Sequence, residues 1–287
     1  MPGGESEGLR RAGVVGYPIA HSLSPVLHRH WLDRYAIAGR YDPVALAPEA
    51  FEAGLAHLLR DEGWRGCNVT IPHKAAACRF ADRLEETARR LGAVNTLVVL
   101  PDGTVEGRNT DLYGFRRNLE TAEGWEAIGR GPAVVVGAGG AARAVVAALQ
   151  DLGFAEIRLL NRSRDKADAL AQELGGAIRA NALANGPAAL DGADLLVNTT
   201  SLGMVGEPPL ELPLDRLPGT AFVTDIVYNP LETDLLGRAR ARGNPTVDGL
   251  GMLLHQAVPG FQAWFEPPEA PAVDGALRAA VLDAMAR

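Results

Sequence analysis

The sequence predicts an α/β protein of two domains, an N-terminal α/β domain and a doubly wound nucleotide-binding domain, with C-terminal helices that return to the first. Its 287 residues favour two domains at roughly 150 residues per domain. From residue 133 onward, short apolar strands alternate with helices, which indicates a parallel sheet covered on both faces. A glycine-rich turn follows the first of these strands. We expect residues 1–110 and 248–287 to form the first domain and residues 111–247 the second.

Composition and charge exclude several classes of protein. Hydrophobic residues make up 47% and charged residues 22% of the chain, as in an ordinary globular protein rather than a disordered one. The net charge is −7 and no long basic block occurs, so nucleic acid is not an expected partner. Two cysteines, Cys67 and Cys78, are too few for a disulfide framework or a zinc cluster.

Neither a membrane span nor a secretory signal is expected. The longest apolar stretch, residues 133–149, is interrupted by Arg143, whereas a spanning helix needs about 18 or more apolar residues. Residues 1–7 carry acidic side chains and no apolar core, unlike a signal peptide. We therefore expect a cytoplasmic protein whose partner is a small molecule.

The N-terminal part of the chain opens with a strand and a helix. Residues 13–16 predict the strand. Ser24 and Pro25 then have the form of a helix N-cap followed by proline in the first helical position. The apolar residues that follow recur every four positions and form one helix face, at Leu27, Trp31 and Tyr35.

Three further elements are expected before residue 110. A second helix carries apolar residues at similar spacing, at Phe51, Leu55, Leu58 and Leu59. Residues 66–71 predict a strand that Pro72 ends, because proline cannot donate to a sheet ladder. Residues 94–100 and 104–108 predict a hairpin around the turn at residues 101–103.

The second half of the chain predicts four buried strands joined by crossover connections, at residues 133–136, 157–160, 194–197 and 222–227. Helices are expected from the glycine-rich turn through Leu152 and at residues 165–174. After Pro245 the chain becomes helical again. This tail is too short to fold alone, so we expect it to pack on the first domain.

The glycine-rich turn reads Gly137-Ala138-Gly139-Gly140-Ala141-Ala142 and matches the G-x-G-x-x-A form of the dinucleotide-binding fingerprint. Gly137 permits the tight turn, Gly139 lets a pyrophosphate approach the backbone, and Ala142 lets helix and strand pack closely. Exposed N–H groups and the positive helix terminus then hold the phosphates. The turn therefore predicts a Rossmann-like dinucleotide site.

The end of the second strand predicts which dinucleotide binds. NAD sites usually place Asp or Glu there to accept from the ribose 2′-hydroxyl. Here the strand ends in Asn161-Arg162-Ser163-Arg164, with Lys166 beyond. No carboxylate stands at the tip, and guanidinium groups bind a 2′-phosphate bidentately. The predicted cofactor is NADP.

Polar residues gather where the chain leaves the predicted strands of the first domain, in His21-Ser22-Leu23-Ser24-Pro25, Asn68-Val69-Thr70-Ile71-Pro72-His73-Lys74, Val94-Asn95-Thr96 and Gly107-Arg108-Asn109-Thr110-Asp111. Considered singly, each residue has a simpler structural explanation: Ser24 or Asp111 would only cap a helix, and Lys74 would be a solvated surface lysine. A buried amide such as Asn95 needs partners. Taken together, these groups suit a neutral polyhydroxylated ring beside a nicotinamide. Reduction of a ketone additionally needs a proton donor.

These segments, in this order, resemble the shikimate dehydrogenase family. The resemblance extends over about residues 13–265 and includes further segments, namely Gly92-Ala93-Val94-Asn95-Thr96, Asp225-Ile226-Val227-Tyr228-Asn229-Pro230 and Asp248-Gly249-Leu250-Gly251-Met252-Leu253-Leu254-His255-Gln256. It implies NADPH-dependent reduction of 3-dehydroshikimate to shikimate, a step of chorismate and aromatic amino-acid biosynthesis.

The resemblance also implies roles for individual residues. Lys74 and Asp111 would be the catalytic pair, and which of them is the formal proton donor stays open. The substrate would be bound by Ser22, Ser24, Asn68, Thr70, Asn95, Tyr228 and Gln256. NADP would be held by Gly137, Ala138, Gly139, Gly140, Ala141, Asn161, Arg162, Ser163, Lys166, Thr200 and Gly249. Arg164 competes with Lys166 as the second basic residue at the adenosine phosphate.

Two alternative functions stay open. A dual quinate and shikimate dehydrogenase belongs to the same superfamily, although Ser22, Ser24 and the strand tip resemble the shikimate-specific, NADP-using branch more closely. The alternative from another class is a non-catalytic sensor that binds NADP and shikimate-like ligands. Retention of both Lys74 and Asp111 argues against a sensor.

The histidines predict no metal site. His28 and His30 are two residues apart on a helix and point to different sides, while His57 is isolated. His73 is expected to be a solvated loop residue beside Lys74. We expect the protein to act as a monomer or a homodimer.

Overall fold

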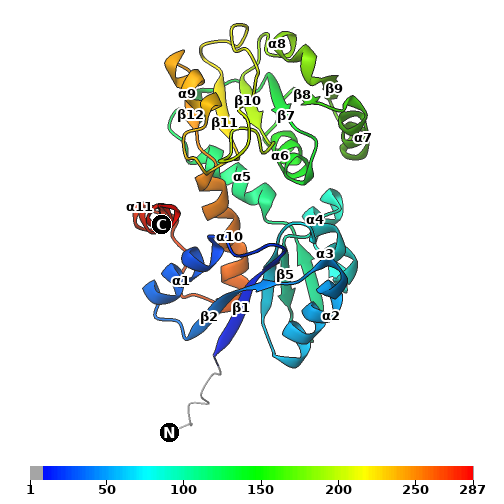
Figure 1. Ribbon diagram of the computed structural model, residues 1–287, viewed down its shortest axis with the longest axis vertical. Coiled ribbons are helices and arrows are strands. Elements are labelled where there is room, and N and C mark those ends of the chain that lie inside the picture. Colours follow the sequence, from blue (N-terminus) through cyan, green and yellow to red (C-terminus); the bar gives the residue numbers. More distant parts are fainter. Residues whose placement is uncertain (1–8, 287) are drawn as a thin grey trace. The chain divides into compact units, whose positions relative to one another are not determined.

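The computed structural model describes residues 9–286, so the segment on which the expectation about a secretory signal rests lies outside the described residues. The described chain divides into two compact units (Figure 1). Unit 1 comprises residues 9–110 and 256–286, and unit 2 comprises residues 111–255.

Unit 1 is built on a mixed six-stranded sheet with the order β2-β1-β3-β5-β6-β4. Its strands are β1 (Arg10–Gly16), β2 (Gly39–Ala45), β3 (Gly66–Val69), β4 (Arg83–Leu84), β5 (Thr96–Val99) and β6 (Val105–Arg108). Strand β1 pairs in parallel with β2 and β3, whereas β3, β5 and β6 pair antiparallel. The antiparallel β5–β6 pair confirms the predicted hairpin.

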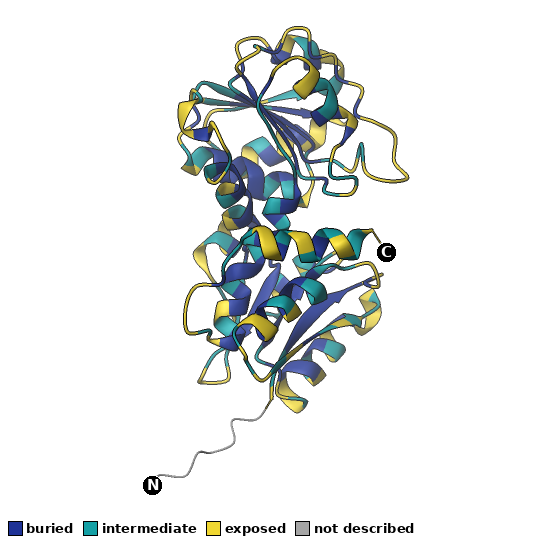
Figure 2. Ribbon diagram, turned by 90° about the vertical axis from the view of Figure 1, so that its left-hand side faces the viewer, coloured by how far each residue is buried: buried dark blue, intermediate teal, exposed yellow. Residues whose placement is uncertain are grey.

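The helices of unit 1 are α1 (Ser24–Arg34), α2 (Phe51–Ala56), α3 (Lys74–Phe80), α4 (Glu86–Leu91) and α11 (Gly275–Met285), together with the second part of α10 (Leu250–Phe265). Helix α2 continues through a π turn at His57–Asp61, which places the expected apolar residues Leu58 and Leu59 in the core. Figure 2 shows buried strands in this unit with helices whose outer faces are exposed.

Two boundaries in unit 1 differ from the prediction for local reasons. Helix α1 begins at Ser24, and the N-cap position is Leu23, which makes no side-chain cap. Ser24 therefore lies inside the helix and does not cap it. Strand β3 ends at Val69, because the His73 N–H donates to the Thr70 carbonyl (2.9 Å) and closes a turn. This turn leaves Ile71 exposed.

Unit 2 contains an all-parallel sheet with the order β9-β8-β7-β10-β11-β12. Its strands are β7 (Pro132–Val136), β8 (Glu156–Asn161), β9 (Ile178–Ala182), β10 (Leu195–Asn198), β11 (Phe222–Asp225) and β12 (Thr246–Val247). Counted from β7, the order is 3-2-1-4-5-6, the doubly wound arrangement of dinucleotide-binding sheets. The predicted fold class is confirmed.

Side chains of the central strands alternate between two cores, because successive residues of a strand point to opposite faces. One core contains Val135 and Val197 and is covered by α5 (Asp111–Glu120), α6 (Gly140–Asp151) and α7 (Arg164–Leu174). The other contains Val134 and Leu196 and is covered by α8 (Gly186–Ala189) and α9 (Asp234–Ala241). The sheet of unit 2 is thus buried on both faces, as the continuous apolar strands predict.

The division of the chain after residue 247 differs from the structure, in which unit 2 extends to His255. The start of α10 lies against α5 within unit 2. The Asn118 amide donates to the Asp248 carbonyl (2.9 Å), and Gly251 faces the same side chain so closely that a Cβ would meet its oxygen at 1.9 Å. A glycine at residue 251 therefore lets the helix approach α5 and belong to unit 2 for its first turns.

Candidate functional site

A network of buried amides and hydroxyls lies at β3 and β5 of unit 1. The Asn95 side chain is 3% exposed; its Nδ2 donates to Thr110 Oγ1 (3.0 Å), and its Oδ1 accepts from the Thr110 N–H (2.8 Å) and Thr96 Oγ1 (3.0 Å). Asn68 faces Thr96 across the β3–β5 pair and donates to its hydroxyl (3.1 Å). The partners that a buried Asn95 requires are therefore present in neighbouring loops.

Gln256 and Thr70 lie at the margins of this network. The Thr110 hydroxyl donates to Gln256 Oε1 (3.4 Å), so a residue of α10 joins residues from β5 and the β6–α5 connection. Thr70 follows β3 and is half-buried, with its N–H bonded to the Val15 carbonyl (2.9 Å). Unit 1 thus brings together four predicted substrate residues: Asn68, Thr70, Asn95 and Gln256.

The two predicted carboxylate-binding serines lie at the beginning of α1. Ser22 Oγ accepts from the Ser24 N–H (3.4 Å), so the two side chains belong to one turn. Ser24 is 7% exposed and Ser22 is half-buried. Hydroxyls at a helix N-terminus lie close to its positive dipole end, which favours a negatively charged group.

Lys74 is the first residue of α3, and His73 before it is buried at 2% exposure. The expectation that His73 is solvated is therefore wrong. Its Nε2 lies 2.7 Å from the Leu46 carbonyl, to which it donates, and its ring stacks on Phe51 with centroids 4.2 Å apart. The backbone carbonyl of Lys74 accepts from Val94 N–H (3.1 Å). The lysine is thus attached to a fixed segment.

Asp111 begins α5 in unit 2 and is 9% exposed. It directly follows Thr110 in the chain, whose backbone and hydroxyl are bonded to Asn95. The position of Asp111 at a helix start suits an ionised carboxylate, because the helix dipole is positive there.

The glycine-rich turn of unit 2 fits the phosphates of a dinucleotide. Gly137 has φ +113° and lies so close to Thr199 that a Cβ would meet its Oγ1 at 2.5 Å, so no other residue is accommodated without strain. A Cβ at Gly139 or Gly140 would meet no atom within 4 Å, which leaves space in front of the backbone. The 12-residue helix α6 begins at Gly140, and Ala142 packs in the core at 0% exposure.

The tip of β8 carries positive charge with no side-chain partners. Arg162 and Lys166 are exposed, and neither side chain has a hydrogen-bond or ion-pair partner among residues 9–286. Arg164 instead pairs with Asp168 (3.4 Å) along α7. The Asn161 amide donates to the Ser163 carbonyl (2.8 Å) and fixes the turn. This arrangement favours Lys166 over Arg164 as the second cation for an incoming anion.

Asp225 organises the loops after β10 and β11, a role that its sequence context did not predict. Its buried carboxylate accepts from Asn198 Nδ2 (3.0 Å), the Val227 N–H (3.0 Å) and Thr233 Oγ1 (2.8 Å). The bond from Val227 ends β11 at Asp225, two residues before the predicted end. Asn198 Oδ1 in turn accepts from the N–H (3.1 Å) and hydroxyl (2.7 Å) of Thr200. The signal in the sequence that could have identified Asp225 is the presence of an acidic residue within an apolar strand.

Tyr228 and Gly249 lie beside this network. Tyr228 follows Val227 in the chain, and burial raises the pKa of its phenol. Gly249 lies so close to the chain before Tyr228 that a Cβ would meet the carbonyl oxygens of Ile226 and Val227 at 2.4 and 2.7 Å. The site residues of unit 2 therefore group at the carboxyl ends of β7, β8, β10 and β11, where ligands of doubly wound sheets bind.

Replacement of Asp225 by asparagine should change the pH dependence of stability. Burial raises the pKa of Asp225 above its usual 3.8, so the folded protein binds this proton more tightly than the unfolded chain. In the wild type, this tighter proton binding adds to the free energy of unfolding below pH 3.8. The contribution is lost as the pH rises through the pKa that Asp225 has in the folded protein. Asp225→Asn loses the Thr233 bond, costing about 1 kcal/mol, but lacks this pH-dependent loss.

We therefore expect the free energy of unfolding of Asp225→Asn to increase relative to wild type between about pH 4 and 7. Urea denaturation at several pH values measures this difference. Asp215→Asn is the control, since Asp215 is exposed in the same unit. A difference from wild type that falls as the pH rises would contradict the expectation.

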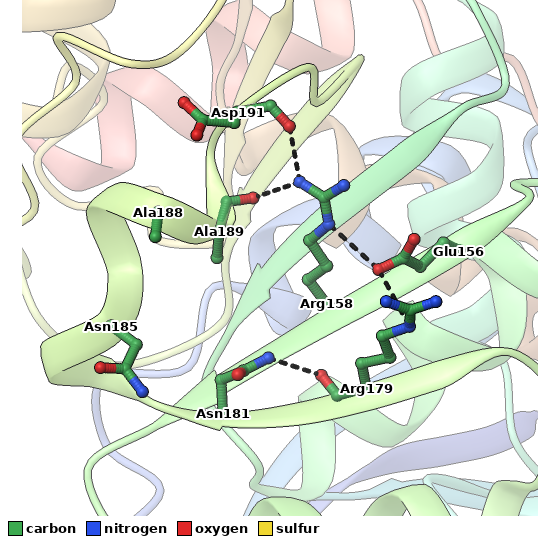
Figure 3. Close-up of a pocket in the computed structure, with 8 residues that line it drawn as sticks. All are labelled: Glu156, Arg158, Arg179, Asn181, Asn185, Ala188, Ala189 and Asp191. Carbon is green, nitrogen blue, oxygen red and sulfur yellow. Dashed lines mark hydrogen bonds and ion pairs between the residues drawn. The ribbon is translucent and has the colours of Figure 1, made fainter.

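A separate hollow of about 430 Å³ lies between β8, β9 and α8 (Figure 3). It is lined by Glu156, Arg158, Arg179, Asn181, Asn185, Ala188, Ala189 and Asp191. Arg158 donates to the carbonyls of Ala189 (2.8 Å) and Asp191 (2.6 Å), and both arginines pair with Glu156. Since these guanidinium groups already bind protein acceptors, the hollow does not resemble the phosphate site at Gly137.

Two general features of the described residues bear on function. Within residues 9–286, no helix has both the length and the apolar character needed to cross a bilayer. The same part of the chain brings no three His, Cys, Asp or Glu side chains into a group able to hold a metal ion. His57, expected to be isolated, contacts the carboxylates of Asp61 (3.0 Å) and Glu62 (3.3 Å).

Comparison with known families gives matches in both units. Residues 14–97 match the family model described as the shikimate dehydrogenase substrate binding domain. Residues 123–204 match the model described as shikimate / quinate 5-dehydrogenase. The two matches lie on the polar network of unit 1 and on the nucleotide-binding sheet of unit 2.

Curated relatives cover nearly the whole chain. A shikimate dehydrogenase (NADP(+)) from Paramagnetospirillum magneticum is 58% identical over 274 residues, covering 95% of this chain and 98% of the relative. A shikimate dehydrogenase (NADP(+)) from Rhodospirillum rubrum is 56% identical, covering 95% of this chain and 97% of the relative.

Solved structures show the same fold. Shikimate 5-dehydrogenase from Thermus thermophilus, in complex with NADP(H) and shikimate, is 35% identical with a TM-score of 0.84, covering 96% of this chain and 100% of that one. Quinate dehydrogenase from Corynebacterium glutamicum, in complex with NAD, is 30% identical with a TM-score of 0.88, covering 96% of this chain and 99% of that one.

Proposed function

The chain belongs to the shikimate dehydrogenase family, and on this premise we propose that it catalyses the reversible NADPH-dependent reduction of 3-dehydroshikimate to shikimate. It is an oxidoreductase that acts on a CH–OH group, in the biosynthesis of chorismate and the aromatic amino acids. The observation that carries the assignment of cofactor and substrate is the identity of 58% with an NADP(+)-dependent shikimate dehydrogenase over nearly the full chain.

We assign substrate recognition to the polar residues of unit 1 and to Tyr228. Ser22 and Ser24 bind the carboxylate through hydroxyls at the start of α1. Asn68, Thr70, Asn95 and Gln256 bind the ring hydroxyls. The support is the network itself: it is buried and rich in both hydrogen-bond donors and acceptors, which suits a polyhydroxylated ring.

We assign the cofactor to the carboxyl edge of the unit 2 sheet. The backbone of Gly137, Ala138, Gly139, Gly140 and Ala141 holds the pyrophosphate at the start of α6, while Asn161, Arg162, Ser163 and Lys166 hold the adenosine phosphate. Thr200 and Gly249 complete the site beside the Asp225 network. When bound, NADPH supplies the hydride that reduces the ketone carbon of the substrate.

Lys74 and Asp111 are the proposed catalytic pair. The Lys74 ammonium polarises the ketone and donates a proton to the oxygen as negative charge develops on it. In the oxidation direction, the neutral amine takes this proton back. The Asp111 carboxylate hydrogen-bonds the ring hydroxyl next to the ketone. His73, anchored to Leu46, fixes the backbone from which Lys74 projects.

The exposed cations at the tip of β8 favour NADP over NAD. Among the solved relatives, the quinate dehydrogenase is in complex with NAD, whereas the carboxylate typical of NAD sites is absent from residues 161–164 of this chain. We therefore place the chain with the shikimate-specific enzymes rather than with a dual quinate and shikimate dehydrogenase. Retention of Lys74 and Asp111 favours an enzyme over a sensor.

The decisive experiment is an absorbance trace of NADPH formation by the purified protein with shikimate and NADP+. We expect turnover with this pair and at least about tenfold lower kcat/KM with quinate or with NAD+. Binding of both ligands without NADPH formation would contradict the enzyme assignment and support a sensor. Equal turnover of quinate would support the dual enzyme.

We further propose that the enzyme works in the cytoplasm as a monomer or a homodimer. Cys67 and Cys78 are both free thiols, as is usual in a reducing compartment. Light scattering during size-exclusion chromatography distinguishes the two oligomeric states by mass.

A further inference from the structure

Tyr41 is a buried tyrosine on an exposed strand, and the mechanism above does not use it. Strand β2 forms an edge of the unit 1 sheet, and Tyr41 is its one buried residue, at 3% exposure. Its hydroxyl donates to Asn68 Oδ1 at 2.6 Å. A proposed substrate residue is therefore hydrogen-bonded to a side chain that reaches it through the protein interior.

His28 holds the Tyr41 ring in this position. The two rings are parallel within 5° and their centroids are 3.8 Å apart. His28 is fully buried, its other ring neighbours being Trp31, Phe261 and Trp264, and burial lowers its pKa to about 3. Stacking on these rings, together with its contact to the Asn68 side chain, fixes the neutral imidazole. The hydroxyl of Tyr41 is thus aimed at Asn68 by a packed aromatic group.

The contacts of Asn68 determine which of its polar atoms remain for a ligand. Its Nδ2 donates to the Asn95 carbonyl (3.3 Å) and to Thr96 Oγ1 (3.1 Å), so both N–H groups are used. Its Oδ1 accepts from Tyr41. Rotation of the amide by 180° would place Oδ1 against the Asn95 carbonyl, which can only accept. In this orientation, Asn68 has no N–H group left for a ligand and can present only its carbonyl oxygen.

We propose that Tyr41 is a positioning residue for substrate recognition, whose hydroxyl holds the Asn68 amide so that only a carbonyl acceptor faces the substrate. This inference rests on the proposed function. A ketone oxygen has no proton to donate, so the oxidised form of the reacting group would face Asn68 without a hydrogen bond. Asn68 therefore binds a ring hydroxyl that stays a hydroxyl throughout the reaction, and so helps to select which oxygen reaches Lys74.

The variant Tyr41→Phe removes the hydroxyl and keeps the ring that stacks on His28. Because the Asn68 oxygen then loses one of the hydrogen bonds that hold the amide in place, we expect KM for shikimate to rise about tenfold, whereas kcat and KM for NADP+ change less than about twofold. Steady-state kinetics with each substrate measures this split. In an Asn68→Ala background, the effect of Tyr41→Phe on KM should be smaller than in wild type, since the hydroxyl acts through Asn68 as well as through its contact with Ser24.

Tyr35→Phe is the matched control. The Tyr35 hydroxyl accepts from the Ala272 N–H (3.0 Å) in the same unit, so this variant also loses one tyrosine hydrogen bond, away from Asn68. We expect its kinetics to equal those of wild type. If Tyr41→Phe leaves KM for shikimate within twofold of wild type, or lowers kcat and raises both KM values together, the positioning role is wrong.

Fluorinated substrates test the same inference on protein that does not carry a Tyr41 substitution. Fluorine cannot donate a hydrogen bond. Of the two analogues in which fluorine replaces a non-reacting ring hydroxyl, the one altered at the position that faces Asn68 should have a KM at least about tenfold higher than that of shikimate. This penalty should disappear in Asn68→Ala. Equal KM values for shikimate and both fluoro analogues would overturn the inference, even if Tyr41→Phe does not fold. Failure of wild type to oxidise shikimate would instead refute the proposed function.

Discussion

Replacing Lys74 by alanine is expected to lower kcat by at least about 10²-fold, with little change in KM for shikimate. A positioned general acid contributes roughly 10²- to 10⁴-fold, because its proton is transferred only in the transition state. Lys74 projects from the first turn of α3, and the preceding His73 is bonded to Leu46 and stacked on Phe51. The structure therefore attaches the ammonium group to a backbone that does not need to reorganise. Steady-state kinetics of shikimate oxidation measures both constants.

Arg79→Ala is the matched control for Lys74→Ala. Arg79 lies exposed on the same helix, and among residues 9–286 its guanidinium donates only to the Ala75 carbonyl (3.3 Å). This variant removes a positive charge from α3 without touching the proposed site, so we expect wild-type kinetics. A Lys74→Ala enzyme with raised KM and unchanged kcat would show that the lysine binds substrate but does not transfer a proton.

Replacing Arg162 by aspartate is expected to shift the preference between NADP+ and NAD+ by about 10²-fold in kcat/KM. The variant removes charge-assisted hydrogen bonds to the 2′-phosphate, worth about 1.5–3 kcal/mol each, and places a carboxylate where it repels that phosphate. The same carboxylate accepts from the free ribose hydroxyl of NAD+. Arg162 is suited to this change because its side chain has no other partner within residues 9–286. Kinetics with both cofactors measures the ratio.

Arg179→Asp is the control for the charge reversal. Arg179 is exposed in the same unit and pairs with Glu156 beside the hollow of Figure 3. Arg179→Asp changes the net charge of unit 2 by the same amount as Arg162→Asp, but at a different place. The ratio of kcat/KM values for NADP+ and NAD+ should therefore stay near that of wild type. An unchanged ratio in Arg162→Asp, or an equal shift in Arg179→Asp, would refute the assignment of Arg162 to the phosphate.

Prediction of the nucleotide-binding unit succeeded where local signals are strong. Continuous apolar strands such as residues 133–136 are buried on both faces of a parallel sheet, so their composition alone identifies them. Strands β9 and β12 were not predicted. Residues 178–182 are only partly buried at the sheet edge, and β12 has two residues, so neither carries a clear apolar pattern.

The polar residues were predicted less evenly. Ser24, Asn68 and Lys74 stand in segments whose composition is unusual for strand ends, which made them visible. Asp225 was not identified as a hydrogen-bonding centre, because its three donors come from residues 198, 227 and 233. His73 was placed in solvent, because nothing in its neighbours along the chain indicates the stacking partner Phe51.

Sequence alone determined the parallel sheet, the glycine-rich turn at Gly137 and the positive tip at Arg162, because each depends on residues that are neighbours along the chain. Tertiary structure decided the hydrogen-bonding state of the proposed substrate residues. Whether Asn68 donates or accepts depends on Tyr41, which is 27 positions away, and on the Asn95 carbonyl, which is equally far in the other direction. The type of a residue is fixed at one position of the sequence, but whether its polar atoms donate to or accept from a ligand depends on the groups packed around it.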